Sequence, residues 1–101
     1  MELEDQYRIL IGGYYGIALM DSYPLKEYLL KDVQKYTEEY MKENPLDNFD
    51  YLEESNRIKD KTPKKRKLQD ALLVLNMING PMDLVFMIKE ELKKYNHKTD
   101  N

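Results

Sequence analysis

The segment from Ala71 to Ile78, with the sequence ALLVLNMI, constrains the fold more than any other part of the chain. As a helix it is apolar on all sides, so no face of it suits contact with water. Such a helix is typical of the middle of a helical bundle or of a dimer interface. A chain of 101 residues can bury one compact core but not two. We therefore expect one domain built around this segment, or a homodimer in which a second copy covers it.

Helical patterns recur along almost the whole chain. Apolar residues return every three or four positions, the spacing of one helical face, and Pro and Asn-Gly signals mark helix ends. A polar tail at 97–101 follows a domain of residues 1–96. The sequence thus predicts an all-α fold, a compact bundle of about five helices, over residues 4–20, 24–44, 48–58, 63–78 and 81–95.

One part of the first helix admits an alternative. Gly12 and Gly13 each lower helix stability by about 1 kcal/mol relative to alanine. A Gly-Gly pair is also a known two-residue hairpin signal, so residues 7–20 can be interpreted as a short β-hairpin. Strict polar–apolar alternation is missing on both arms, and we favour the helix. In a helix, Gly12 and Gly16 share a face, which would let another backbone come close.

The residue inventory excludes several kinds of chemistry. The chain has no cysteine and one histidine, His97, and neither a nucleophile–base pair nor a phosphate-binding glycine loop occurs. We therefore expect no enzymatic activity, no cofactor and no metal site. The longest apolar run has 12 residues, from Ile9 to Met20, against about 20 needed to cross a bilayer. With an acidic rather than basic start, we expect a cytoplasmic protein that does not enter membranes.

Charge is strongly segregated along the chain. Residues 38–54 hold seven acidic residues and one lysine, a net charge of −6, whereas residues 57–67 hold seven basic residues and one aspartate, a net charge of +6. Two interpretations stay open. The two blocks face each other across a turn and cancel, or one or both form a docking surface for an oppositely charged partner.

The basic block places four consecutive cations, residues 64–67, in the first turn of a helix, where the helix dipole disfavours positive charge. A docked anion would offset this cost by meeting both the side chains and the exposed backbone N–H groups. Sequence-specific DNA readout is not expected, because the match to a helix-turn-helix is poor. Our alternative function is therefore a nucleic-acid accessory protein that contacts phosphates through Arg57, Lys59, Lys61, Lys64, Lys65, Arg66 and Lys67.

Nine tyrosines are more than a core of this size can bury with every hydroxyl satisfied. Tyrosine is enriched at interface hot spots, and several tyrosines lie close to the acidic block. The leading hypothesis is therefore a small non-enzymatic protein-interaction module, a binder, inhibitor or regulator of another protein, with a basic protein as the expected partner. Its predicted binding residues are Tyr36, Glu39, Tyr40, Glu43, Asp47, Asp50 and Tyr51.

Overall fold

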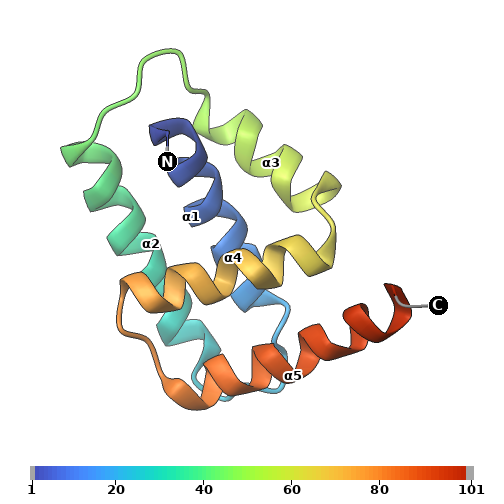
Figure 1. Cartoon of the computed structure of the whole chain (residues 1–101). Helices are drawn as coiled ribbons and strands as arrows, with labels where there is room; N and C mark the ends of the chain where they lie inside the picture. The colour runs from blue at the N-terminus through green and yellow to red at the C-terminus, as the bar shows by residue number, and fades with distance from the viewer. Residues whose placement is uncertain (1, 100–101) are drawn as a thin grey trace.

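The computed structural model describes residues 2–99, with side chains described up to Tyr95. No strand occurs in that range, so the predicted all-α fold is confirmed and the alternative hairpin over residues 7–20 does not form. The chain folds into a compact bundle of five helices (Figure 1): α1 (Leu3–Ala18), α2 (Lys26–Glu43), α3 (Tyr51–Lys61), α4 (Lys64–Met77) and α5 (Met82–Thr99).

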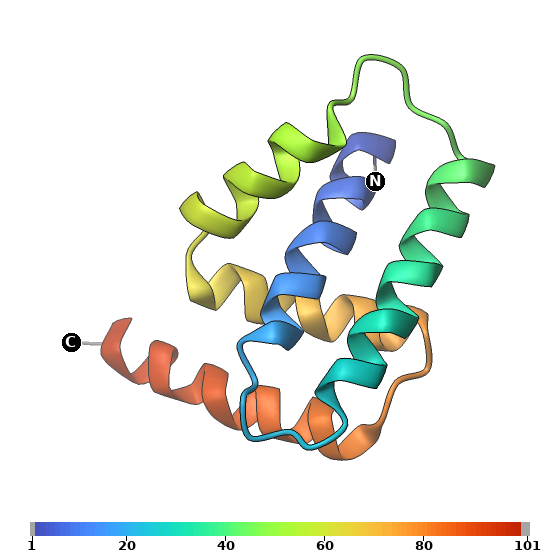
Figure 2. The same ribbon diagram turned by 180° about the vertical axis from the view of Figure 1, so that it is seen from behind.

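The glycines of α1 explain why residues 7–20 form a helix. α4 crosses α1 and packs directly on its glycine face (Figures 1 and 2). A Cβ atom at Gly16 would overlap the carbonyl oxygen of Lys67, and one at Gly13 would overlap a methyl group of Val74. The expected close approach of another backbone is therefore confirmed, and α4 is the partner. The packing of two helices outweighs the low helix propensity of the glycines.

The core lies around the α1–α4 crossing. α4 buries one face of the apolar segment completely, whereas Leu73 on its outer side stays 45% exposed. Met82 and Phe86 of α5 are also exposed on the surface. A homodimer in which a second copy of the chain covers this exposed side of α4 stays a prediction. The largest fully buried side chains are Leu10, Ile11, Ile17, Val33, Leu68, Val74, Leu75, Leu84 and Ile88.

α2 and α3 lie on either side of α1 and both pack against it (Figure 2). The loop of residues 44–50 joins the end of α2 to the start of α3 and passes over the N-terminal end of α1 (Figure 1). Tyr7 of α1 holds this loop in place, because its hydroxyl donates to the carbonyl oxygen of Asn44 at 2.5 Å and its ring meets Phe49 edge-on. Between α2 and α3, α1 presents the partly exposed side chains of Tyr14 and Tyr15.

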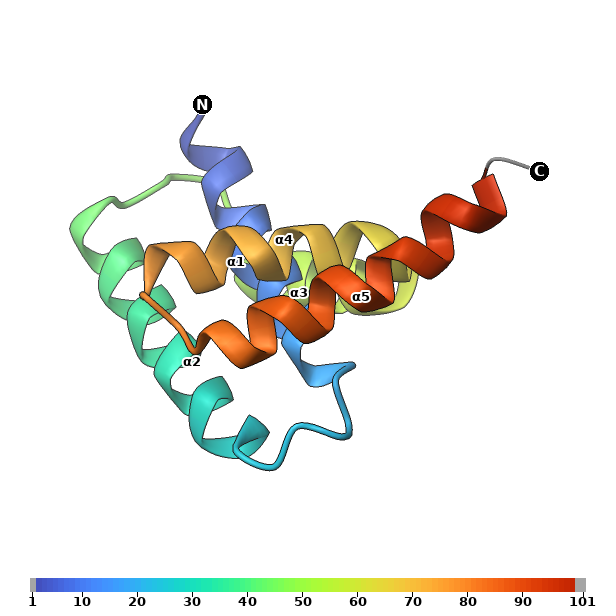
Figure 3. The ribbon, with the colours of Figure 1, turned by 60° about the horizontal axis from the view of Figure 1, so that its bottom comes forward.

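α5 runs beside α4, and its C-terminal end extends beyond the other helices (Figure 3). The turn between them follows the expected Asn79-Gly80 signal. Asn79 has a positive φ of 52°, and Gly80 N–H donates to the carbonyl oxygen of Leu75 at 2.8 Å, which is the Schellman arrangement. α5 continues to Thr99, into the segment expected to be a tail, and residues 100–101 of that tail lie outside the described residues.

Two helix starts differ from the sequence expectation. α2 begins at Lys26 instead of Pro24, because the preceding residues form turns in which Tyr23 is buried and its hydroxyl bonds Asp83 at 3.3 Å. α3 begins at Tyr51 instead of Asn48, because Asp50 caps it by accepting a hydrogen bond from the Glu53 N–H at 3.1 Å. None of the helices within residues 2–99 is long and apolar enough to span a membrane.

Candidate functional site

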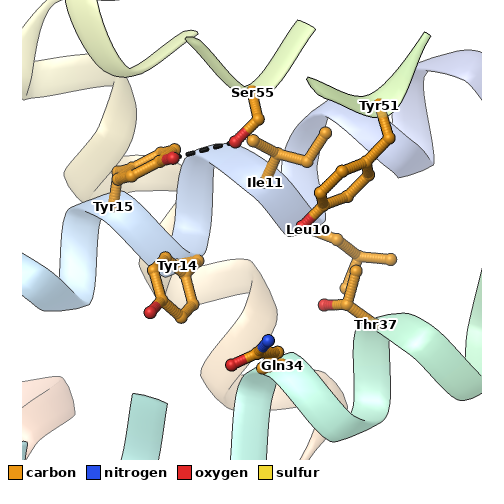
Figure 4. A pocket seen from close by; sticks show the side chains of 8 residues that line it. All are labelled: Leu10, Ile11, Tyr14, Tyr15, Gln34, Thr37, Tyr51 and Ser55. Atoms are coloured by element: carbon orange, nitrogen blue, oxygen red, sulfur yellow. Dashed lines mark hydrogen bonds between the residues drawn. The ribbon is translucent and has the colours of Figure 1, made fainter. Parts of the chain in front are cut away.

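A hollow of about 230 Å³, which we call the tyrosine cleft, lies between α1, α2 and α3 (Figure 4). Its floor is apolar, and tyrosine, amide and hydroxyl side chains surround it. Three helices contribute to it, so the cleft exists only in the folded chain. The residues that line it are Leu10, Ile11, Tyr14, Tyr15, Gln34, Thr37, Tyr51 and Ser55.

Some of the polar groups in the cleft are already bonded. The hydroxyls of Tyr15 and Ser55 share a hydrogen bond of 2.8 Å between α1 and α3 (Figure 4), and the Thr37 hydroxyl donates to the Val33 carbonyl oxygen at 2.8 Å. The hydroxyls of Tyr14 and Tyr51 and the amide of Gln34 make no hydrogen bond to any other described residue. The cleft therefore combines a fixed wall with three polar groups available to a ligand.

Tyr51 is the most accessible tyrosine of the cleft. The residue is 48% exposed, and its side chain points from α3 into the hollow with the hydroxyl toward Leu10 (Figure 4). Burial of the hydroxyl raises the pKa of Tyr51, and Tyr15 and the carboxylate of Glu38 raise it further. Tyr51 thus stays a neutral hydrogen-bond donor at physiological pH.

The volume of the cleft favours one class of occupant. Small-molecule and cofactor sites usually span roughly 300–1,000 Å³. At about 230 Å³ the cleft is smaller, and it suits a single large side chain of another protein. Among the described residues, no group of three His, Cys, Asp or Glu side chains is arranged to hold a metal ion.

The structure does not bring the seven predicted partner-binding residues together on one face. Tyr51 lines the tyrosine cleft, whereas Tyr36 and Glu39 line a different hollow, between α2 and the α4–α5 turn. Tyr40 is half-buried and stacks on Tyr36, with ring centroids 6.4 Å apart. Both of these rings also pack against the core, so much of their area serves the fold.

The remaining predicted acids lie along one exposed stretch of the chain. The end of α2, the loop and the start of α3 carry exposed carboxylates that form no ion pair with any described residue. We call this surface the acidic arch. It includes Glu38, whose charge acts on Tyr51, so the arch borders the tyrosine cleft. Its members are Glu38, Glu39, Glu43, Asp47, Asp50 and Glu53.

The acidic and basic blocks do not cancel each other. Within the described residues, Arg57 is the only cation of the basic block that pairs with the acidic block, through Glu54. Its hydrogen bond lowers the pKa of Glu54 against the opposing effect of burial. Within α3 the acidic block ends at Glu54 in the first turn, and the basic block begins one turn later at Arg57 and continues to Lys59 and Lys61 in the last turn. α3 therefore has an acidic N-terminal end and a basic C-terminal end, and the two blocks meet at the Glu54–Arg57 pair.

The seven predicted phosphate-contacting residues divide into two groups. Lys67 is buried, and its ammonium group donates to the Lys59 carbonyl oxygen at 2.5 Å, while Arg66 pairs with Asp70 at 3.2 Å and Arg57 with Glu54. These three have structural partners. The other four extend from the α3–α4 corner without an ion pair to any described residue: Lys59, Lys61, Lys64 and Lys65.

Sequence reasoning missed Gln34, Thr37 and Ser55 as cleft residues. One signal could have revealed two of them. Thr37 and Ser55 are small polar residues on the otherwise apolar faces of their helices, and both are buried. Comparison of the chain with protein families, with curated proteins and with solved structures finds no match.

Proposed function

We propose that this protein is a non-enzymatic binding module for a basic segment of another protein, and that it seats one apolar or aromatic side chain of that segment in the tyrosine cleft. The observation that carries the proposal is the combination of an apolar floor with the unbonded hydroxyls of Tyr14 and Tyr51. Tyrosine supplies a large contact area at low cost in side-chain entropy, and its hydroxyl orients the bound group.

The negative charge beside the cleft favours a basic partner. The acidic arch borders the cleft through Glu38, and its carboxylates have no ion pairs in the described chain that would have to be broken on binding. A field of one sign beside a pocket attracts oppositely charged partners and speeds their association. A segment with Lys or Arg residues on both sides of a large apolar residue matches this combination.

The chemistry of the cleft favours binding over catalysis. Its polar side chains are hydroxyls and one amide, and the pKa of Tyr51 is raised, so this hydroxyl is even less ready to ionise near pH 7. General acid–base catalysis needs a group that titrates near the working pH. The lining residues provide hydrogen bonds and shape but no such group.

The proposal is tested by capturing the partner from the cells that express the protein, with the wild type and two variants as bait. Tyr51→Ala removes a cleft tyrosine, and Tyr28→Ala removes a tyrosine that is 70% exposed on α2 and does not line the cleft. We expect the wild type and Tyr28→Ala to capture the same basic protein, and Tyr51→Ala to bind it about 5- to 1,000-fold more weakly. Equal capture by both variants would contradict the proposal.

A second candidate function rests on a separate observation, the four unpaired lysines at the α3–α4 corner. Contacts to nucleic-acid phosphates through these residues would release counterions and make binding fall steeply with salt. A mobility-shift assay on mixed-sequence DNA, with and without alanine at positions 59, 61, 64 and 65, tests this. A shift that survives the substitutions, or no shift at low salt, eliminates this candidate.

A further inference from the structure

A second hollow, of about 180 Å³, lies at the junction of α1, α3 and α4 and shares no residue with the tyrosine cleft. Three arginines line it, one from each helix: Arg8, Arg57 and Arg66. The Thr62 side chain also lines it, and the Thr62 hydroxyl makes no hydrogen bond to a described residue. Guanidinium groups repel one another, so three of them at one small hollow require compensating negative charge.

Four nearby carboxylates supply that compensation. Arg8 pairs with Glu4, Asp5 and Glu54. Arg57 pairs with the same Glu54, and Arg66 pairs with Asp70. These pairs hold the guanidinium groups in position.

The pairs leave several N–H donors unused. The Nε atom of Arg8 is buried without a hydrogen-bond partner, which is true of no other buried side-chain polar atom in residues 2–95. Native proteins rarely leave such a donor unsatisfied, and a bound ion or water is one explanation for it. Arg66 uses only its Nε atom with Asp70, so its two terminal nitrogens also remain available.

We propose that this hollow, which we call the arginine pocket, binds a terminal phosphate group, a phosphate monoester or free phosphate. Arginine N–H groups match the oxygens of a tetrahedral phosphate in pairs, and a hydroxyl such as that of Thr62 can donate another hydrogen bond. Donors from three helices converge on the hollow. A phosphate monoester presents three terminal oxygens to these donors, whereas a phosphodiester presents only two.

Four carboxylates oppose an anion here: Asp5 and Asp70 line the pocket, and Glu4 and Glu54 pair with its arginines. Asp5 is exposed to solvent, which weakens its repulsion. Asp70 is buried, and burial raises its pKa to about 6 although Arg66 acts in the opposite direction. Asp70 therefore takes up a proton as the pH falls through about 6, and its negative charge is then lost. The pocket can lose that part of the repulsion without unfolding.

The test measures binding of inorganic phosphate and methyl phosphate to the full chain by titration calorimetry, at constant ionic strength, with dimethyl phosphate as the diester probe. Arg66→Gln removes a guanidinium that is 62% exposed, so we expect the fold to tolerate it. Lys64→Gln is the matched control, since it removes one charge nearby from a residue that does not line the pocket. Arg8→Lys keeps the charge of residue 8 but removes its Nε donor. Circular dichroism verifies that each variant is folded.

We expect the wild type to bind both monoester probes more tightly than dimethyl phosphate. Arg66→Gln and Arg8→Lys should each weaken binding about tenfold or more, the usual loss of a charge-assisted hydrogen bond. Lys64→Gln should change it by less than about threefold, as expected for a screened surface charge. No monoester binding by the wild type at about 50 mM would overturn the inference, as would equal losses in Lys64→Gln and Arg66→Gln. Equal binding of the diester would also contradict it and would favour nucleic-acid phosphates.

Discussion

The carboxylate of Asp70 on α4 lies directly against Gly12 on α1, with no room for a methyl group between them. This contact belongs to the crossing at which three glycines of α1 receive α4. It places the charged group of Asp70 inside the protein, and it explains both the tight packing of the two helices and the raised pKa of that carboxyl.

The glycines of the crossing should differ in their tolerance of alanine. Gly16→Ala meets the backbone carbonyl of Lys67, which cannot move by itself, and we expect a loss of about 1–3 kcal/mol in the free energy of unfolding. Gly12→Ala meets the end of the Asp70 side chain, which can rotate, so its loss should be smaller. Urea denaturation measures both, and a more stable Gly16→Ala variant would show that the helices do not cross this closely.

The free energy of unfolding should depend on pH through the titration of Asp70. Its pKa is about 6 in the folded state, against about 3.9 for an unperturbed aspartate, so the folded state binds the proton more tightly. Stability from this group is therefore fully present below about pH 4 and is lost as the pH rises through about 6. Asp70→Asn removes the buried charge. We expect it to exceed the wild type in unfolding free energy by about 1–3 kcal/mol at pH 7.

At pH 4 that difference should shrink to about 0.5 kcal/mol, because Asp70 is then protonated in the folded state and about half protonated in the unfolded state of the wild type. Ion pairs such as Arg57–Glu54 are present in both proteins and cancel in the comparison. Urea denaturation of the two proteins between pH 4 and 7 provides the measurement. A difference that does not change with pH would mean that Asp70 titrates normally.

Replacement by alanine should lower the free energy of unfolding by different amounts at two leucines of α4. Leu75 is 1% exposed and Leu73 is 45% exposed, although both belong to the apolar segment of α4. Leu75→Ala should cost about 2–5 kcal/mol in unfolding free energy, and Leu73→Ala less than about 1 kcal/mol. If Leu73→Ala proves as costly as Leu75→Ala and the loss depends on protein concentration, a second copy covers this face in solution.

Much of the fold follows from the sequence because the signals for it are local. The three- and four-residue spacing of apolar side chains predicts each helix, and the pair Gly12 and Gly16 predicts a close helix contact. Helix starts are less predictable, because a few residues compete as caps. Asp50 caps α3 where Asn48 was expected to start it, and the burial of Tyr23 delays the start of α2.

The two candidate sites are harder to predict from the sequence, because tertiary structure brings their residues together. Tyr51 was predicted from its position beside the acidic block, but the cleft in which it lies also needs Gln34 and Thr37 from another helix. Arg8 and Arg66 are 58 positions apart, and nothing local connects them. The cytoplasmic location expected from the composition stays a prediction.

The most direct test of the binding proposal maps the surface that contacts the captured basic partner, by NMR on the isotope-labelled protein. Chemical shifts of backbone amides should change around the tyrosine cleft, at Leu10, Tyr14, Thr37, Tyr51 and Ser55, and remain unchanged at Tyr28 and Phe86. The changes should also weaken as salt is added, because the acidic arch contributes to the attraction. Shifts confined to the α3–α4 corner or to the outer face of α4 and α5, with the cleft unaffected, would contradict the central claim.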